Sequence, residues 1–181
     1  WNHNPNDKMW SLNKERKGWL RLHSMPAKQL LWAKNSLTQR AIGPVSYTSV
    51  KLDASRLKMG DEAGLGAMNT PYASLGVMKT EKGLSLRCYD QNTNKEVLKP
   101  IAKNKVVWLR LWGDYDKSLL QYSYSLDGKT WENIGEQMLS PYQLKTFQGV
   151  RVALYAFNKA GVNGGVADFD DFKVEEPMAD R

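Results

Sequence analysis

Apolar and polar side chains alternate along several short stretches of the chain. The clearest is Lys105–Trp112, where aliphatic residues take every second position and mainly aromatic or basic residues lie between them. A period of two places alternate side chains on opposite faces of a β-strand. Four separated stretches share such an aliphatic face: Leu20/Leu22, Leu84/Leu86, Val107/Leu109/Leu111 and Val150/Val152/Leu154. These faces are expected to meet in a core between two sheets.

The segment Phe147–Val174 contains two strand patterns, Val150–Phe157 and Val166–Val174, on either side of a glycine-rich turn. This arrangement predicts a hairpin that closes the fold. Within the second run the apolar residues change phase, which sends the later side chains to the opposite face. A β-bulge is therefore expected near Asp170–Asp171.

Turn residues separate the strand patterns at short intervals. Asp127-Gly128 lies between two such patterns and is a strong hairpin signal, because Asp-Gly suits turns that need positive φ angles. Only Ala54–Gly60 resembles a helical turn, and Glu132–Lys145, which contains Pro141, is expected to be an irregular connection. Many short strands with almost no helical periodicity indicate an all-β protein, a two-sheet antiparallel β-sandwich.

The length of the chain suits one domain. Its 181 residues suffice to bury a core, and no internal repeat or low-complexity linker divides them, so residues 1–181 are expected to form one sandwich domain. The chain opens on Trp1 without a targeting segment, and we therefore expect a fragment of a larger multidomain protein. No apolar run approaches the length of a membrane span, so no membrane partner is expected.

The net charge of +7 comes from 26 basic and 19 acidic residues that are scattered along the chain. Because no run of about five or six like charges is present, a nucleic-acid partner is not expected. The single cysteine, Cys88, rules out an internal disulfide and lies in an apolar strand pattern typical of a buried thiol. Two histidines and one cysteine do not supply the ligands of an ordinary zinc site.

Aromatic rings and basic side chains lie opposite the aliphatic faces of the strand patterns. These candidate recognition residues are Trp19, Arg21, His23, Arg87, Tyr89, Trp108, Arg110, Trp112, Arg151, Tyr155 and Phe157. They are expected to line up across one sheet. Flat rings beside guanidinium groups suit a carbohydrate, whose apolar faces stack on rings and whose hydroxyls accept hydrogen bonds. They suit a protein interface equally well. The remaining interpretation is that individual tryptophans are ordinary core residues.

A group of carboxylates lies near the expected bulge. Asp168, Asp170 and Asp171 are hard oxygen ligands of the kind that Ca²⁺ prefers, so a structural calcium ion is a hypothesis for this group. The pair Asp114 and Asp116 lies at a strand end, where solvated turn acids are usual. The sequence contains no nucleophile–His–acid arrangement, P-loop or dinucleotide-binding glycine motif.

Short matches that run in order through nearly the whole chain carry a family resemblance. They are Trp1-Asn2-His3-Asn4-Pro5, Trp10-Ser11-Leu12, Gly18-Trp19-Leu20-Arg21-Leu22, Leu37-Thr38-Gln39-Arg40, Gly60-Asp61-Glu62-Ala63-Gly64-Leu65, Tyr122-Ser123-Tyr124-Ser125 before Asp127-Gly128-Lys129, Thr146-Phe147-Gln148-Gly149-Val150-Arg151, and Ala167-Asp168-Phe169-Asp170-Asp171-Phe172. With these motifs the sequence resembles the C-terminal β-sandwich domain of glycoside hydrolase family 43 enzymes, the β-xylosidases and α-L-arabinofuranosidases. The resemblance implies a concanavalin A-like jelly roll of two antiparallel sheets, in agreement with the strand patterns.

The resemblance also implies where catalysis takes place. In such enzymes the catalytic acids lie on a separate five-bladed propeller upstream in the chain, so no catalytic residue is assigned to this sequence. The family's sandwich packs on that propeller and can send a loop toward the rim of the active site. The Phe147 region and Asp90–Asn94 are the candidate loops. The parent enzyme is expected to be bacterial and either secreted or periplasmic.

Three functions follow from these observations. The leading interpretation is a non-catalytic accessory domain of a xylan- or arabinan-degrading enzyme, which docks on the catalytic propeller, shapes the substrate entrance or holds plant hemicellulose. The second is an autonomous carbohydrate-binding module for xylan-type polysaccharide. The third is a free-standing glycosidase on the same scaffold, which predicts turnover by this chain alone.

Overall fold

A computed structural model describes residues 1–101, 104–144 and 149–177 of the chain. The regular elements of these residues are β1 (Trp10–Leu12), β2 (Leu20–His23), β3 (Met25–Pro26), the short 3-10 helix η1 (Leu30–Trp32), β4 (Ser36–Arg40), β5 (Val45–Asp53), β6 (Asp61–Met68), β7 (Ala73–Thr80), β8 (Gly83–Asp90), β9 (Lys95–Pro100), β10 (Val106–Asp114), β11 (Leu119–Ser125), β12 (Glu132–Leu139), β13 (Arg151–Asn158) and β14 (Val166–Glu175).

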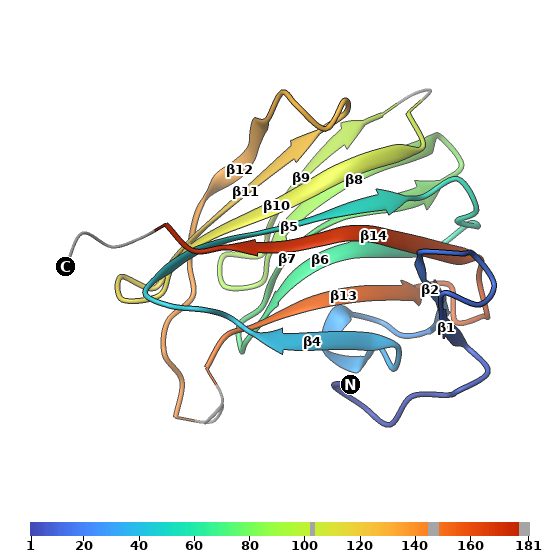
Figure 1. Cartoon of the computed structure of the whole chain (residues 1–181), viewed down its shortest axis with the longest axis horizontal. Coiled ribbons are helices and arrows are strands. Elements are labelled where there is room, and N and C mark those ends of the chain that lie inside the picture. Colours follow the sequence, from blue (N-terminus) through green and yellow to red (C-terminus); the bar gives the residue numbers. More distant parts are fainter. Residues whose placement is uncertain (102–103, 145–148, 178–181) are drawn as a thin grey trace.

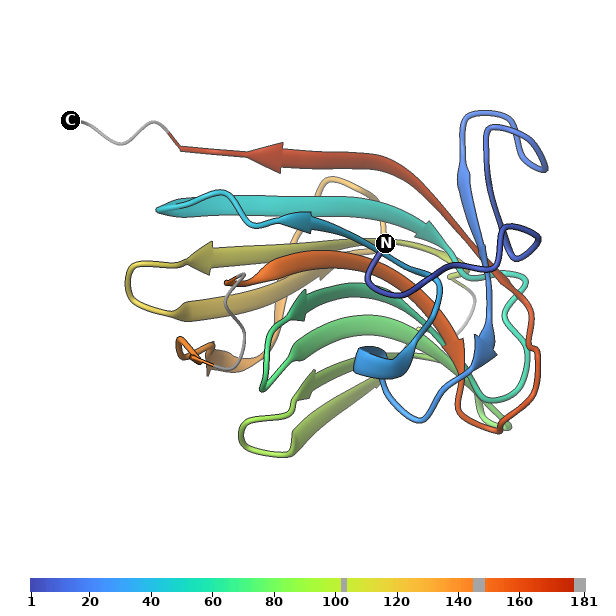
Figure 2. The same cartoon turned by 90° about the horizontal axis from the view of Figure 1, so that it is seen from below.

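The strands form two sheets that pack face to face (Figure 1). Sheet A has the order β1-β2-β14-β5-β10-β11-β12. Sheet B has the order β3-β13-β6-β7-β8-β9, with β4 also paired to β13. Among the described strands the short β3–β13 pair is parallel, and the other neighbours run antiparallel. Figure 2 shows the two layers from another side, with β13, β6 and β7 of sheet B curving past β14 and β5 of sheet A. The predicted all-β sandwich is confirmed.

The aliphatic faces predicted from the sequence meet between the sheets. Leu22, Leu86 and Leu109 have no exposed surface and belong to one core cluster with the apolar residues of the facing layer. Burial alternates along all of β5 and along β10 as far as Gly113, as expected for strands with one face in the core and the other toward solvent. The core thus takes most of its side chains from the inward faces of the strands, and Leu57 and Ile101 add to it from connections.

Part of sheet B is buried on both faces. The segment around η1 lies over its outer side, and Leu30 packs there with Tyr155, Phe157 and Tyr72 in a second apolar cluster. Glycines on the sheet make room for this layer. A methyl group at Gly76 would lie 2.5 Å from the hydroxyl of Tyr155, so that ring can lie against the sheet only because Gly76 has no side chain.

The predicted closing hairpin is wrong. Strand β13 belongs to sheet B and β14 to sheet A, so the glycine-rich connection between them crosses from one layer to the other. Asp61 fixes this crossing, because its Oδ2 accepts hydrogen bonds from the backbone N–H groups of Lys58 and Gly165, each at 2.7 Å. Its Oδ1 accepts one from the Asn158 amide at 2.8 Å. A side chain at Gly164 would collide with the same carboxylate.

Two other local predictions are confirmed and one is wrong. The pairing of β14 with β5 shifts register between Asp170 and Lys173, and Asp171 has a φ of 52°, which is the predicted bulge. The Asp127-Gly128 turn joins β11 and β12, and Gly128 has a φ of 75°. Residues 132–139 of the expected irregular connection form strand β12 instead, since Ile134 and Met138 contribute to the core.

Candidate functional site

The predicted recognition residues do not share one sheet. Sheet A carries Trp19, Arg21, His23, Trp108, Arg110 and Trp112 on β2, β10 and the residue before β2. Sheet B carries Arg87, Tyr89, Arg151, Tyr155 and Phe157 on β8 and β13. The prediction of one aligned face is therefore wrong. Strands β8 and β13 share the two-faced pattern of β10 but lie in the opposite layer, so their outer faces point the other way.

Aromatic rings and cations are interleaved on the outer face of sheet A. We call the group formed by Trp19, Tyr47, Lys51, Trp108, Arg110 and Trp131 the tryptophan–cation surface. Lys51 Nζ lies 5.2 Å from the ring centre of Trp19 and 5.4 Å from that of Trp108. The Arg110 guanidinium lies 4.1 Å from the ring centre of Trp131 and 5.5 Å from that of Tyr47. These distances are within the range of cation–π attraction, so the rings and the charges position one another.

Strand register brings these side chains together. Trp108 on β10 is directly opposite Lys51 on β5, and the next outward residue, Arg110, is opposite Ser49. The members of the surface are half-buried, as is Trp112 farther along β10. Trp19, Trp108 and Trp112 therefore lie outside the core cluster between the sheets. The sequence reasoning missed Lys51 and Trp131, although the alternation in Val45–Asp53 places Lys51 opposite the aliphatic face.

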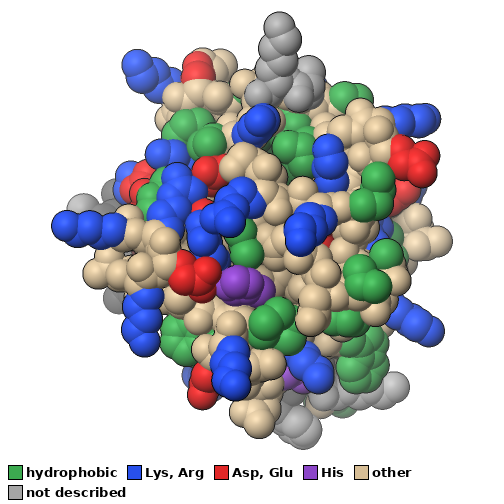
Figure 3. Space-filling model, turned by 90° about the vertical axis from the view of Figure 1, so that its right-hand side faces the viewer, with side chains coloured by type: hydrophobic (Ala, Val, Ile, Leu, Met, Phe, Trp, Pro, Cys, Tyr) green, Lys and Arg blue, Asp and Glu red, His purple; other side chains and the backbone are tan. Residues whose placement is uncertain are grey.

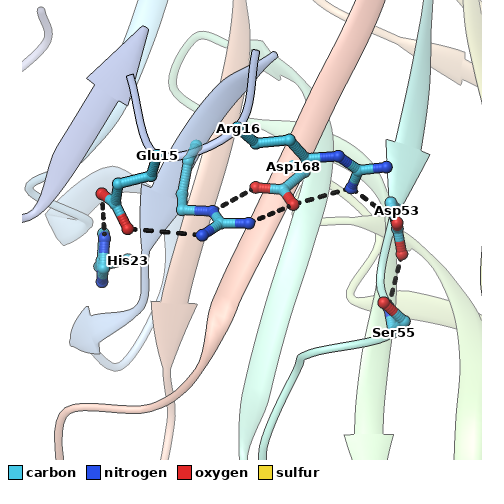
Figure 4. Close-up of polar contacts among 7 residues, drawn as sticks. Glu15, Arg16, His23, Asp53, Ser55 and Asp168 are labelled. Atoms are coloured by element: carbon cyan, nitrogen blue, oxygen red, sulfur yellow. Dashed lines mark hydrogen bonds and ion pairs between the residues drawn. The ribbon is translucent and has the colours of Figure 1, made fainter. Parts of the chain in front are cut away.

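A network of ion pairs lies at one end of the tryptophan–cation surface (Figure 4). Asp168 accepts hydrogen bonds from Arg21 Nε at 2.6 Å, from Arg21 Nη2 at 2.8 Å and from Arg16 Nη1 at 2.8 Å. Arg16 Nη1 also donates to Asp53 at 2.7 Å. Burial alone would raise the pKa of Asp168, but the hydrogen bonds and charges of Arg21 and Arg16 outweigh it and hold that pKa below its ordinary value. Seen from this end, Lys and Arg side chains are more prominent than acidic ones (Figure 3).

The network corrects the role predicted for Arg21. Arg21 is buried and its guanidinium is committed to Asp168 and, at 3.4 Å, to Glu15. His23 Nε2 forms a 2.9 Å hydrogen bond with Glu15 Oε1, and this contact lowers the pKa of Glu15. Arg21 is thus part of the scaffold beneath the surface and is not exposed on it.

The aspartates proposed as calcium ligands are not grouped around one point. Asp168 is neutralised by two arginines, and Asp171 pairs with Lys173 at 3.0 Å. Within residues 1–101, 104–144 and 149–177, no three His, Cys, Asp or Glu side chains are arranged to hold a metal ion. These contacts do not favour calcium at Asp168, Asp170 and Asp171, and the test of that hypothesis is a measurement with a chelator.

The outer face of sheet B hides two of its predicted recognition residues. Tyr155 is 0% and Phe157 1% exposed, because the η1 segment covers them, and their assignment to a recognition surface is wrong. Arg87 is half-buried and lies 4.3 Å from the ring centre of Tyr89. Arg151 donates a 2.7 Å hydrogen bond to the Asn2 side chain, which fastens the start of the chain to β13.

A buried carboxylate organises the same face. Glu62 is 1% exposed and forms ion pairs with Lys159 at 2.5 Å and with Arg87 at 3.3 Å, while the Tyr155 hydroxyl donates to it at 3.1 Å. Sequence reasoning missed this centre. The available signal was an acidic residue inside the apolar and glycine-rich run of β6, where an ion of either sign needs a partner.

Five connections converge at the end of the sandwich opposite the ion-pair network. We call this the loop end, and it comprises residues 41–44, 69–72, 114–118, 140–144 and 149–150. Backbone hydrogen bonds join Ser140 N to Ser118 O at 2.8 Å and Ala41 N to Val150 O at 3.1 Å. A cavity of about 250 Å³ lies among these connections. Of the candidate loops, Asp90–Asn94 borders this end through Gln91 N and Tyr72 O, whereas Phe147 lies outside the described residues.

Comparisons with known proteins place the chain in a family. The family model described as the beta-xylosidase C-terminal concanavalin A-like domain matches residues 1–175. A curated protein of Xylanibacter ruminicola is 31% identical over 139 residues, which are 75% of this chain and 24% of that protein. A beta-xylosidase of Formosa agariphila is 28% identical over 194 residues, covering 95% of this chain and 32% of that protein.

A solved structure agrees with these matches. A bifunctional GH43-CE protein of Bacteroides eggerthii superposes with a TM-score of 0.91 at 36% identity, covering 99% of this chain and 24% of that chain. This chain thus spans about a quarter to a third of the length of its relatives. No helix in the described ranges is long and apolar enough to cross a membrane. The chain belongs to the family of β-xylosidase C-terminal concanavalin A-like domains.

Proposed function

We propose that this chain is a non-catalytic accessory domain of a xylan-degrading, β-xylosidase-type enzyme and that it docks on the catalytic propeller through the loop end. The observation that carries the proposal is the exposure of large apolar side chains there. Leu144 is 72%, Tyr142 67% and Leu139 57% exposed, and Ile42 lies at the same end. Apolar side chains that gather at one end of a molecule mark an interaction site.

The shape of the loop end supports a docking role. The cavity beside Tyr142 is lined by Ala41, Tyr115 and Val150, so it can receive a side chain from a facing domain. The relatives are three to four times as long as this chain, which leaves room for a propeller in them. Action on plant hemicellulose would place such an enzyme in the periplasm or outside the cell.

The docking proposal is tested in the longer protein that carries this chain. The Tyr142→Ala/Leu144→Ala double variant is expected to lower kcat/KM for an aryl β-xyloside by about tenfold or more, because a displaced domain misplaces the substrate entrance. The matched control is Val162→Ala, an exposed apolar residue on the connection between β13 and β14. Unchanged kcat/KM and unchanged thermal unfolding of the double variant would contradict docking. The 181-residue chain alone is expected to hydrolyse neither the aryl β-xyloside nor xylan.

A second role is favoured by the tryptophan–cation surface, which we propose holds polysaccharide. Its tryptophans are half-buried on the outer face of sheet A and not in the core. Trp108→Ala is expected to weaken the binding of the isolated chain to xylan in calorimetry. The third interpretation, a free-standing glycosidase, is not favoured by the acids of the described residues. The buried ones, Asp61, Glu62, Asp90, Asp114 and Asp168, each bind cations or backbone N–H groups.

A further inference from the structure

We propose that the tryptophan–cation surface binds acidic polysaccharide, through the carboxylates of hexuronic acid units, and not a neutral sugar chain. The inference rests on the polysaccharide-holding role proposed above and names the chemistry of its ligand. Two observations carry it: the cations of this surface form no ion pair with a carboxylate of the described residues, and the rings beside them already hold cations.

The unpaired cations are Lys51 and Arg110. In the part of the chain that the structure describes, no carboxylate oxygen lies within 4.0 Å of the charged nitrogens of either residue. Three other buried or half-buried arginines, Arg16, Arg21 and Arg87, are each bound to two carboxylates. Arg151 is bound to the Asn2 side chain, and the exposed Arg40 and Arg56 form no ion pair with a described carboxylate. Glu175 attracts Arg110 only from beyond ion-pair distance. A half-buried cation that is held by rings and has no carboxylate bound to it is placed to receive an anion.

The ring faces explain why a neutral sugar fits less well. The Arg16 guanidinium lies 3.7 Å from the ring centre of Trp19, and Arg110 lies 4.1 Å from that of Trp131. Trp108 is packed against the turn at Gly128, where an added methyl group would lie 2.9 Å from the ring. Stacking of a sugar needs an open ring face. Here the rings hold cations, so the group presented to a ligand is the charge.

The two cations are spaced for more than one carboxylate. Arg110 is opposite Ser49 in the register of β10 and β5, and Lys51 is two residues along from Ser49 on the same strand. Such diagonal neighbours are about 7 to 8 Å apart at the backbone. Arg110 Nε donates to Ser123 Oγ at 3.0 Å, which fixes the guanidinium while its other N–H groups form no hydrogen bond with a described residue.

Acidic residues also lie on the outer face of sheet A, but none of the described ones forms an ion pair with Lys51 or Arg110. Asp53 and Asp168 are bound by Arg16 and Arg21 at one end. Asp170 is opposite Lys51 and Glu175 is opposite Tyr47 in the register of β14 and β5, yet neither approaches Lys51 or Arg110 as an ion pair. An incoming carboxylate is therefore attracted by Lys51 and Arg110 near the centre of sheet A and repelled by the acidic residues of β14.

The test is calorimetric titration of the isolated 181-residue chain with glucuronoxylan and with the same polymer after its carboxyl groups have been reduced to alcohols. The dissociation constant for the acidic polymer is expected to be at least tenfold lower, and added salt should weaken that binding. Lys51→Gln and Arg110→Gln are each expected to raise the dissociation constant for glucuronoxylan several-fold, with unchanged circular dichroism and thermal unfolding. Lys82→Gln, an exposed lysine on the β7–β8 turn of sheet B, is the matched control and should change nothing.

The outcomes separate this inference from the proposed roles. Equal binding of the acidic and the reduced polymer would keep the polysaccharide-holding role and overturn the inference. Binding of neither polymer would overturn both. Equal weakening by Lys82→Gln, or binding of polyglutamate as tight as that of glucuronoxylan, would mean non-specific attraction to the net positive charge and would also overturn the inference. The docking proposal is judged separately, by the activity of the Tyr142→Ala/Leu144→Ala variant.

Discussion

Replacing Asp168 with asparagine is expected to lower the free energy of unfolding by about 3 kcal/mol at neutral pH. The Asp168 side chain is 2% exposed and accepts three hydrogen bonds from Arg21 and Arg16. Removing one partner of a buried ion pair costs about 3 to 5 kcal/mol, because the opposite charge stays buried without compensation. The lower end of this range applies, since Arg16 is about one-third exposed and keeps its bond to Asp53.

The pH dependence of this loss has a definite sign. The arginines hold the pKa of Asp168 below its ordinary value in spite of the opposing effect of burial. A carboxylate whose pKa is depressed by folding stabilises the fold above its unfolded pKa, and the contribution is lost as the pH falls through the folded pKa. The difference in unfolding free energy between the wild type and Asp168→Asn is therefore expected to be widest near neutral pH and to shrink below about pH 4.

Urea unfolding followed by tryptophan fluorescence at pH 7 and at low pH measures both effects, and the thermal midpoint should fall by about 6 to 12 °C at pH 7. Asp171→Asn is the matched control on the same strand. Its carboxylate is about half exposed, it pairs only with Lys173, and asparagine tolerates a φ of 52° well. The control should change stability by less than about 0.5 kcal/mol. A loss of less than about 1 kcal/mol in Asp168→Asn, or an equal loss at both pH values, would refute the reasoning.

Three further predictions concern packing, thiol reactivity and metal binding. Gly76→Ala should lower the unfolding free energy by about 1 to 3 kcal/mol, because the methyl group would lie 2.5 Å from the Tyr155 hydroxyl, whereas Gly43→Ala, which meets no atom within 4 Å, should change little in the same urea titration. Burial raises the pKa of the Cys88 thiol to about 12, so a disulfide reagent at pH 8 should modify the native chain more than about a hundredfold more slowly than the urea-unfolded chain, and equal rates would show that the thiol is accessible. Removal of divalent cations with a chelator should leave the thermal midpoint unchanged, because arginines already neutralise Asp168; a fall that calcium reverses would restore the calcium hypothesis.

The alternation of side chains predicted which face of each strand enters the core, and it did so because a strand has only two faces. The alternation does not indicate which of the two sheets a strand joins. Arg87 on β8 and Arg110 on β10 follow the same pattern, yet one lies on sheet B and the other on sheet A. Layer membership depends on long-range pairing, such as that of β13 with β6, to which the local sequence gives no signal.

The burial of Tyr155 and Phe157 could not be predicted either. It depends on the η1 segment, about 120 residues earlier in the chain, which covers the outer face of sheet B. The bulge at Asp170–Asp171 was predictable, because the apolar residues change phase within the sequence of that strand. The bulge and the Asp127-Gly128 turn were thus predicted correctly, whereas strand β12 and the contacts between β13 and the η1 segment were not.

The two proposed roles can operate together because they use different parts of the molecule. Along β10, Trp108 belongs to the tryptophan–cation surface and Asp114 to the loop end, and six residues of a strand span about 20 Å. A propeller docked on Tyr142 and Leu144 would therefore leave Lys51 and Arg110 open to a polymer. In the longer protein, Lys51→Gln should leave turnover of a small aryl β-xyloside unchanged and slow only the degradation of an acidic xylan. If both activities fell together, the surface would belong to the docking interface and the separation of roles would be wrong.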